Sequence, residues 1–387
     1  MHSVIYRVAA GITGLLLATV VPASAAGTTG GAAAGITGWR VIKIFSQAES
    51  SGIGVTATSA SDAWSIWWNE AATGPAAFVE RYDGSAWRQV PVPEILINDI
   101  LDTLSVGAST ASNVWDFWGS VPDGTGAIRW NGHTWRSVQL PGFVIRVSPD
   151  PADDPNAQAV VFGPNAVWVF SVGSATESTP DHFAARYNGR NWTKVPLPAT
   201  PVWISALAPN DIWGLGPAAG GRHQEILMHF NGTRWTTTPP VPGVKLVSGD
   251  VGYVNELTAT GPRDAWLQQG VLLRSGNNGA PLYLLHWNGT RWAKIKFGVR
   301  VSQVDDAAQD GHGGLWLIDQ GPAPGQHWYI DHLNAGHWTR YAGPSVRGMT
   351  LEDLSSITLI PGTRSMLVTG DLSKGHGNYG LVLKFGP

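Results

Sequence analysis

Carboxylates recur at the start of short apolar segments that read as strands. They occur in NDILDTL, YVNELTA, QVDDAA and LEDLSS, as Asp102, Glu256, Asp305, Asp306, Glu352 and Asp353. If such strand starts meet around one opening, their oxygens could hold Ca²⁺. Two carboxylates at a suitable separation could instead catalyse glycoside hydrolysis. The simpler interpretation, which we favour, is that they are solvated strand ends and turn caps. Asp102, Glu256, Asp306 and Asp353 are the candidate channel acids.

Tryptophan supplies the second set of candidates. The chain contains 20 Trp. Thirteen belong to the two repeated series described below, and Trp130 and Trp287 directly precede the repeated turn. Five fall outside the repeat: Trp67, Trp68, Trp118, Trp203 and Trp328. Exposed indoles beside polar groups suit sugars, because the apolar C–H faces of a sugar ring stack on them. The alternative is that these side chains pack beneath loops. As ligand-binding residues they would have to be exposed and close together.

The elements that position these residues follow from a repeated string. NGTRW occurs at 231–235 and again at 288–292, and looser copies are YDGSAW, WNGHTW, YNGRNW and LNAGHW. The Trp of this string falls at positions 87, 135, 192, 235, 292 and 338, and GWRVIKIF places Trp39 one period upstream. A repeat of roughly 40–50 residues is typical of propellers.

A second Trp series runs between the first. It follows a polar turn at positions 64, 115, 168, 213, 266 and 316. Each unit therefore reads as four short strands; in one unit these are VWISALA, DIWGLGP, EILMHF and RWTTTPP. Asn-Gly before the last strand predicts a tight hairpin in which both central residues have positive φ. We expect the repeated Trp to pack blade against blade, since a large apolar residue recurring once per unit is typical of a core.

The number of units predicts the architecture. Six units carry both Trp, and a seventh lacks the second-strand Trp. SSITLI, SMLVTGD and YGLVLKFGP supply three C-terminal strands, and GWRVIKIF is an unpaired strand at the other end. We therefore predict an all-β fold: a seven-bladed β-propeller of four-stranded blades, closed by the N-terminal strand completing the C-terminal blade.

Loop length distinguishes the two faces of the predicted ring. The longest connections join second to third strands or one blade to the next, and they cover 139–158, 173–182, 215–224, 239–250 and 269–280. The other turns are short. The five surplus Trp fall on the long-loop face, where we expect function because binding residues concentrate on such loops.

The repeated Asp-x-Trp and aromatic-Asn-Gly-x-x-Trp strings resemble the secreted, Trp-rich seven-bladed propellers of bacteria, in the broad kelch-like and galactose-oxidase-like group. The resemblance covers most of 36–387. Most units depart from kelch blades by lacking paired glycines after the second strand. A copper radical site would require a cysteine cross-link, and the chain has no Cys. The resemblance therefore implies a fold and little about activity.

The ends and the composition limit the possible partners. Residues 1–25 read as a signal peptide ending in Ala23-Ser24-Ala25, 26–35 as a flexible lead-in and 36–387 as the propeller. The protein is expected to be secreted without a membrane anchor. Charged residues are 14% of the chain and the net charge is −3, which argues against nucleic acid. No cofactor is expected, apart from the weak Ca²⁺ possibility above, and a monomer is expected.

Three functions remain open from the sequence. The favoured one is an exported binding module for carbohydrate or cell-wall glycan, with the long-loop face as its surface. The second is a carbohydrate-active hydrolase or lyase that uses the channel carboxylates. The third is a scaffold for extracellular proteins, which would show a broad apolar patch and no pocket. We expect binding rather than catalysis.

Overall fold

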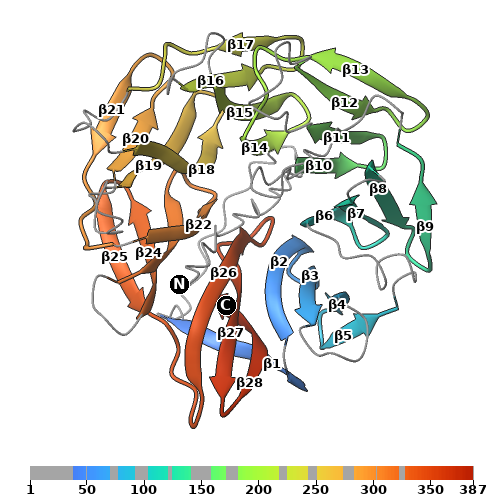
Figure 1. Ribbon diagram of the computed structural model, residues 1–387, viewed down its shortest axis with the longest axis vertical. Helices are drawn as coiled ribbons and strands as arrows, with labels where there is room; N and C mark the ends of the chain where they lie inside the picture. The colour runs from blue at the N-terminus through green and yellow to red at the C-terminus, as the bar shows by residue number, and fades with distance from the viewer. Residues whose placement is uncertain are drawn as a thin grey trace, which may run out of the picture.

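The protein is a ring of seven antiparallel four-stranded sheets (Figure 1). The computed structural model describes residues 38–48, 50–69, 77–91, 103–120, 124–140, 158–170, 182–217, 225–242, 251–272, 283–301, 303–321 and 327–386. Each sheet follows the chain in order, except the last, whose order is β1-β28-β27-β26. The predicted seven-bladed β-propeller is confirmed.

The strands are numbered along the chain. Blade 1 contains β2 (Ser50–Ser59), β3 (Asp62–Asn69), β4 (Ala77–Tyr82) and β5 (Trp87–Val90). Blade 2 contains β6 (Thr103–Thr110), β7 (Asn113–Ser120), β8 (Gly124–Trp130) and β9 (Trp135–Val138). Blade 3 contains β10 (Gln158–Gly163), β11 (Ala166–Phe170), β12 (Phe183–Tyr187) and β13 (Trp192–Pro196). Blade 4 contains β14 (Trp203–Ala208), β15 (Asp211–Pro217), β16 (Glu225–Phe230) and β17 (Trp235–Thr237).

The remaining blades follow the same plan. Blade 5 contains β18 (Val251–Gly261), β19 (Asp264–Leu272), β20 (Tyr283–Trp287) and β21 (Trp292–Ile295). Blade 6 contains β22 (Gln303–Gln309), β23 (Leu315–Gln320), β24 (Trp328–Asn334) and β25 (His337–Ala342). Blade 7 contains β26 (Thr350–Leu359), β27 (Met366–Lys374), β28 (Gly377–Phe385) and the N-terminal β1 (Trp39–Ala48).

Blade 7 closes the ring with strands from both ends of the described chain. β1 pairs antiparallel with β28, from Trp39 opposite Phe385 to Ala48 opposite Tyr379. Figure 1 shows the blue β1 beside the red C-terminal strands. The closure at Trp39 is as predicted, and it leaves no interrupted sheet in the ring.

The repeated Asn-Gly string forms a turn whose geometry differs from the prediction. Gly232 has a φ of 93°, whereas Asn231 uses its side chain, whose Oδ1 accepts the N–H groups of Thr233 and Arg234 at 3.1 Å each. Phe230 and Trp235 are the paired residues on either side, so the loop has four residues rather than two. The expectation of positive φ at both Asn and Gly is wrong here, because the Asn side chain caps the turn instead.

The repeated Trp form the blade interfaces. Trp64 is fully buried, and its ring centroid lies 5.9 Å from that of Trp130 and 6.2 Å from that of Trp135 in the next blade. Trp168 contacts Phe230 in the same way, at 5.0 Å. The packing role predicted for this Trp series is confirmed.

The topology places two kinds of connection on opposite faces. Turns between first and second strands and between third and fourth strands lie on one face, which we call the short-turn face. The other connections lie on the long-loop face, and most of their residues are outside the described ranges. First strands of neighbouring blades lie side by side around the ring. No helix in the described ranges has the length and apolarity needed to cross a bilayer.

Candidate functional site

Trp67 is buried rather than exposed. Its relative exposure is 0%, its ring centroid lies 4.3 Å from that of Phe45 and 6.4 Å from that of Phe78, and its Nε1 donates to Ser65 Oγ at 2.7 Å. Phe45 belongs to β1, so Trp67 fills the long-loop end of the interface between blades 7 and 1. The expected exposure of this side chain is wrong, because the closing strand covers it.

Trp328 and Trp203 brace neighbouring blades. Trp328 has a relative exposure of 5%, against the expectation, and its Nε1 donates to the carbonyl of Glu352 in blade 7 at 2.6 Å. Trp203 is half-buried, and its Nε1 donates to the carbonyl of Val254 in blade 5 at 3.2 Å. Each indole ties its blade to the first strand of the next.

The five surplus Trp do not form one described surface. Trp67, Trp203 and Trp328 lie at three different blade interfaces. The backbones of Trp68 and Trp118 belong to β3 and β7, and their side chains lie outside the described residues. Most of the long segments expected to carry function also lie outside the described residues.

Two of the four predicted channel acids are buried within blade interfaces instead of lining an open mouth. The relative exposure is 2% for Glu256 and 1% for Asp306. The carboxylate of Asp306 accepts the N–H of Ala307 at 2.8 Å and that of Ile357, in blade 7, at 2.7 Å. These carboxylates therefore lie where neighbouring first strands meet, and the expectation of solvated strand ends is wrong for them. Asp102 lies outside the described residues.

Burial raises the pKa of these acids. It raises the pKa of Asp306 to about 7 and, together with the neighbouring charge of Asp306, holds the pKa of Glu256 well above its ordinary value. The half-buried Asp305 has its pKa raised to about 7 by burial and by the charge of Asp353. Blades 5 and 6 thus hold a group of carboxyls whose pKa values are raised by burial.

An Arg completes this group in blade 6. Arg340 donates through Nε to Asp331 Oδ1 at 2.9 Å, and its Nη2 also contacts Asp319. Burial and the charge of Asp331 raise the pKa of Asp319 to about 9. No group of three or more His, Asp or Glu among the described residues is arranged to hold a metal ion.

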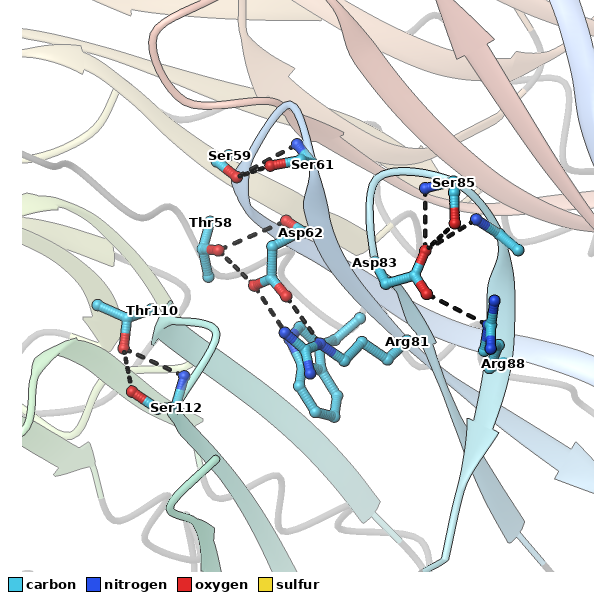
Figure 2. A network of polar contacts seen from close by, with 12 residues as sticks. Thr58, Ser59, Ser61, Asp62, Arg81, Asp83, Ser85, Arg88, Thr110 and Ser112 are labelled. Carbon is cyan, nitrogen blue, oxygen red and sulfur yellow. Dashed lines mark hydrogen bonds and ion pairs between the residues drawn. The ribbon is translucent and has the colours of Figure 1, made fainter. Parts of the chain in front are cut away.

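A side-chain cassette repeats at the short-turn end of blades 1 to 6. In all six blades it combines the second-strand Trp with the cross-strand residue on the third strand, and in blades 1, 2 and 4 to 6 an Asp or Asn before the Trp binds one of the two. In blade 1, Asp62 accepts from Arg81 Nε at 2.9 Å and from Trp64 Nε1 at 3.3 Å, and the Arg81 guanidinium lies 5.2 Å from the centre of the Trp64 ring. Figure 2 shows Asp62 between Thr58 and Arg81.

The third-strand residue of the cassette changes around the ring. Arg lies over Trp in blades 1 to 3, at Arg81, Arg129 and Arg186. His stacks on Trp in blades 4 to 6, at His229, His286 and His332, with ring centroids 4.0–4.1 Å apart. Each of these His also contacts a carboxylate, which belongs to Asp211, Asp264 and Asp310 respectively.

In blade 7, three residues of the cassette are replaced. The Trp position is Leu367, which pairs with Lys384 at the cation position. The residue two before Leu367, where blades 1, 4 and 5 have Asp, is Ser365. Lys384 therefore has neither an indole beneath it nor the carboxylate that the cassettes of blades 1 and 4 to 6 contain.

A pocket of about 380 Å³ lies at this position, between blades 7 and 1. We call it the seam pocket; its lining is Arg40, Ile42, Lys43, Ile360, Leu367 and Lys384 from blade 7, and Ser59, Ala60, Ala63, Tyr82, Ser85, Ala86 and Trp87 from blade 1. Tyr82 and Trp87 correspond to Trp130 and Trp135, against which Trp64 packs at the next interface. The smaller Leu367 leaves room that an indole occupies elsewhere.

The seam pocket gathers positive charge. Arg40 and Lys384 are directly opposed on β1 and β28, and a bulge between Val41 and Lys43 adds one residue to β1. Arg40 donates one hydrogen bond, from Nη1 to the carbonyl oxygen of Gly386, at 2.8 Å. Burial and the charge of Arg40 lower the pKa of Lys384.

Sequence reasoning missed the cassette, and with it the pocket. The signal was present, because Arg or His precedes an aromatic residue in RYDG, RWNG, RYNG, HFNG and HWNG, and precedes Leu in HLNAG, whereas the last copy reads LKFG. The absence of a seventh second-strand Trp is visible in the sequence. Its consequence depends on which side chains of the next blade face the position that the Trp would fill.

Comparison with known proteins supports the fold. No family model matches the chain, and no curated protein matches it. A polysaccharide lyase described as an ulvan lyase superposes with a TM-score of 0.52 at 12% identity, over 89% of this chain and 96% of its own. At that identity the likeness shows the propeller fold alone.

Two fungal proteins are also similar in structure. The fucose-recognising lectin of Aleuria aurantia, a six-bladed propeller, has a TM-score of 0.43 and 12% identity over 79% of this chain and 99% of its own. AofleA of Arthrobotrys oligospora has a TM-score of 0.47 and 15% identity over 85% and 94%. These likenesses carry no argument about ligand.

Asp116 tests the effect of buried acids on stability. Burial raises its pKa to about 8, although the N–H of Phe117 binds it, and its Oδ1 has no hydrogen-bond partner. In the native protein this carboxyl therefore keeps its proton up to about pH 8. In the unfolded chain its pKa has the ordinary value of 3.8, so it loses the proton at lower pH. Between these values the free energy of unfolding falls as pH rises. Asp116→Asn should make this fall shallower, by up to one proton, in urea unfolding from pH 5 to 8.5. Equal slopes in the two proteins would contradict the assignment.

Leu367→Trp tests whether the seam pocket is a vacated indole position. The new indole should pack on Tyr82 and Trp87 as Trp64 packs on its neighbours, raising stability by about 0.5–2 kcal/mol, as cavity filling commonly does. Thermal unfolding should show a higher Tm. Val368→Trp, at the adjacent fully buried core position, is the control and should lower the Tm. A lower Tm for Leu367→Trp as well would contradict the vacancy.

Proposed function

We propose that this chain is a carbohydrate-binding module and that the seam pocket holds the sugar. One observation carries the proposal: the pocket takes the place of an indole and is walled by two aromatic rings. Tyr82 and Trp87 have ring centroids 5.6 Å apart, with planes inclined at 39°. A sugar ring presents flat C–H faces of the kind that the missing indole would have presented.

The rest of the lining suits this ligand. Ligand sites in proteins are commonly 300–1,000 Å³ and mostly apolar, with a few polar groups that fix orientation. Here Ile42, Ala60 and Ala86 supply accessible apolar surface, and Arg40 and Lys384 supply donors for hydroxyl or acidic groups.

The proposed site lies on the short-turn face. The turns of blade 1 that contain Ser59 and Ser85, and the start of β1, all meet there. The favoured surface from the sequence was the long-loop face, and for Trp68 and Trp118 that remains a prediction. The two surfaces are distinguishable because substitutions at one leave the other unchanged.

We also propose that the protein is exported, without a membrane anchor, after removal of residues 1–25, and acts as a monomer on a glycan or an extracellular protein. The signal-peptide pattern supports this proposal. A kelch-like kinship is likewise a proposal from the Trp strings. Mass spectrometry of protein recovered from the medium would refute export if residues 1–25 were retained.

Tyr82→Ala should abolish carbohydrate binding while Tyr187→Ala should not. The two Tyr occupy the same repeat position and make the same contact, each hydroxyl donating to a glycine carbonyl at 2.9 Å. Tyr187 faces the buried Trp115, whereas Tyr82 faces the seam pocket. Affinity for glycans identified on an array should fall roughly tenfold or more for Tyr82→Ala alone. Equal losses for both variants would point to a general effect on the fold, and no loss for either would refute the site.

A second function is favoured by the acids of blade 6. Asp305 is half-buried, keeps its proton to about pH 7 and feels the charge of Asp353. One protonated and one ionised carboxyl is the pairing that glycoside hydrolysis uses. We therefore propose hydrolysis or lysis of a polysaccharide as the alternative activity.

The alternative predicts that the wild-type protein releases reducing ends from a polysaccharide. This activity should be lost in Asp305→Asn and retained in Asp83→Asn, since the Asp83 carboxylate is exposed on the opposite face. The activity should fall as pH rises above about 7, because Asp305 must be protonated to act as the acid. Absence of cleavage by the wild-type protein across a polysaccharide panel would refute catalysis and leave the binding proposal intact.

A further inference from the structure

We infer that the ligand of the seam pocket is an acidic sugar, one that carries a carboxylate or sulfate beside its ring. This inference rests on the proposed carbohydrate-binding function and goes beyond it by assigning the ligand's charge. It follows from how blade 7 departs from the cassette of the other blades.

The first step is the missing carboxylate. In blade 1, Asp62 contacts both the indole Nε1 of Trp64 and the guanidinium of Arg81. Blades 4 to 6 keep an Asp in contact with the third-strand His. In blade 7 the cation position is kept, as Lys384, whereas the ring and the acid are both lost. Blade 2 has Asn113 in place of this Asp, and blade 3 has Ala166. A ligand that restores the cassette in the form found in blades 1 and 4 to 6 would supply a ring and, beside it, a negative charge.

The second step is the cross-strand pair. Arg40 and Lys384 are directly opposite each other in an antiparallel ladder, so their side chains lie on the same face of the sheet. Like charges in this arrangement are destabilising. Among the described residues neither forms an ion pair within 4.0 Å with a carboxylate. An anion between them would convert this repulsion into attraction.

The third step is the bulge in β1. Without it, Lys43 and Arg40 would point to opposite faces, because side chains alternate along a strand. The register shift between Val41 and Lys43 brings both residues into the lining of one pocket. Bulges commonly re-aim a side chain next to a functional site. Three cations therefore meet in one pocket of a protein whose net charge is −3.

The nearest carboxyls do not neutralise this pocket. Asp83, in the turn of blade 1, accepts from Ser85 and Ala86 and pairs with Arg88 at 3.2 Å; Figure 2 shows these contacts. Glu80 is buried, and burial raises its pKa although the charge of Lys43 opposes this. Lys43 therefore interacts with a carboxyl whose charged form is disfavoured by burial.

The experiment compares ligands that differ only in charge. Binding of the wild-type protein to oligogalacturonate is measured calorimetrically against the same oligomer as its methyl ester, and binding to dextran sulfate against dextran. The first pair tests a carboxylate and the second a sulfate. We expect at least one acidic ligand to bind at least about tenfold more tightly than its neutral partner, and the advantage to shrink as salt is raised from 50 to 500 mM.

The variants assign this binding to the pocket. Lys384→Gln should weaken binding of the acidic ligand by about tenfold or more and reduce its salt dependence. Lys374→Gln, an exposed Lys on the opposite face, should leave both unchanged. Leu367→Trp should block acidic ligands while leaving the protein folded, which separates loss of the site from loss of the fold.

Each outcome decides between the two proposals. Equal binding of acid and neutral partner, blocked by Leu367→Trp, would overturn the charge inference and support the sugar site. If Lys374→Gln weakened binding of the acidic ligand as much as Lys384→Gln does, the inference would also be overturned, because the attraction would then be non-specific. Binding of none of these ligands, and of no neutral glycan on an array, would overturn the proposed function itself.

Discussion

The structure depends on one interaction made at six of seven interfaces: the second-strand Trp of one blade packs against large apolar residues of the next. These residues are aromatic at most interfaces, and one of them is Leu333 between blades 5 and 6. Trp64, Trp115 and Trp168 are essentially inaccessible to solvent, and each lies against an aromatic pair of the following blade. Without cysteines to form disulfides, such packing must hold the ring together. Each buried indole removes on the order of 200 Å² from water.

The polar part of the cassette makes the packing specific. An Arg or His lies over the outer face of the indole, and an Asp or Asn fixes that cation or the indole N–H. Hydrogen bonds from His286 and Thr260 hold the pKa of Asp264 below its ordinary value even though burial opposes this. A blade that loses both the indole and the acid keeps a basic third-strand residue without these two partners. Blade 7 is that blade, and its interface contains the seam pocket.

Much of the fold could be predicted from the sequence, because Trp recurs once per blade on two strands. The seven blades and the closure at Trp39 follow from that period. The geometry of the turns did not follow, since the string NGTRW leaves open whether Asn adopts positive φ or caps the loop. Burial of Trp67 could not be predicted either. A residue outside the repeat is not for that reason on the surface, and Trp67 is covered by Phe45 from a strand more than twenty residues away.

The candidate site was less predictable, because it arises from what one blade lacks. Glu256 and Asp306 were expected at the mouth of the channel, but the first-strand packing directs them into blade interfaces. The seam pocket depends on contacts between the two ends of the chain. A crystal structure of the protein with a bound acidic oligosaccharide tests the central claim most directly. The account predicts a sugar ring against Tyr82 and Trp87, with its acidic group at Lys384 and Arg40. A ligand bound on the long-loop face, with the seam pocket empty, would contradict it.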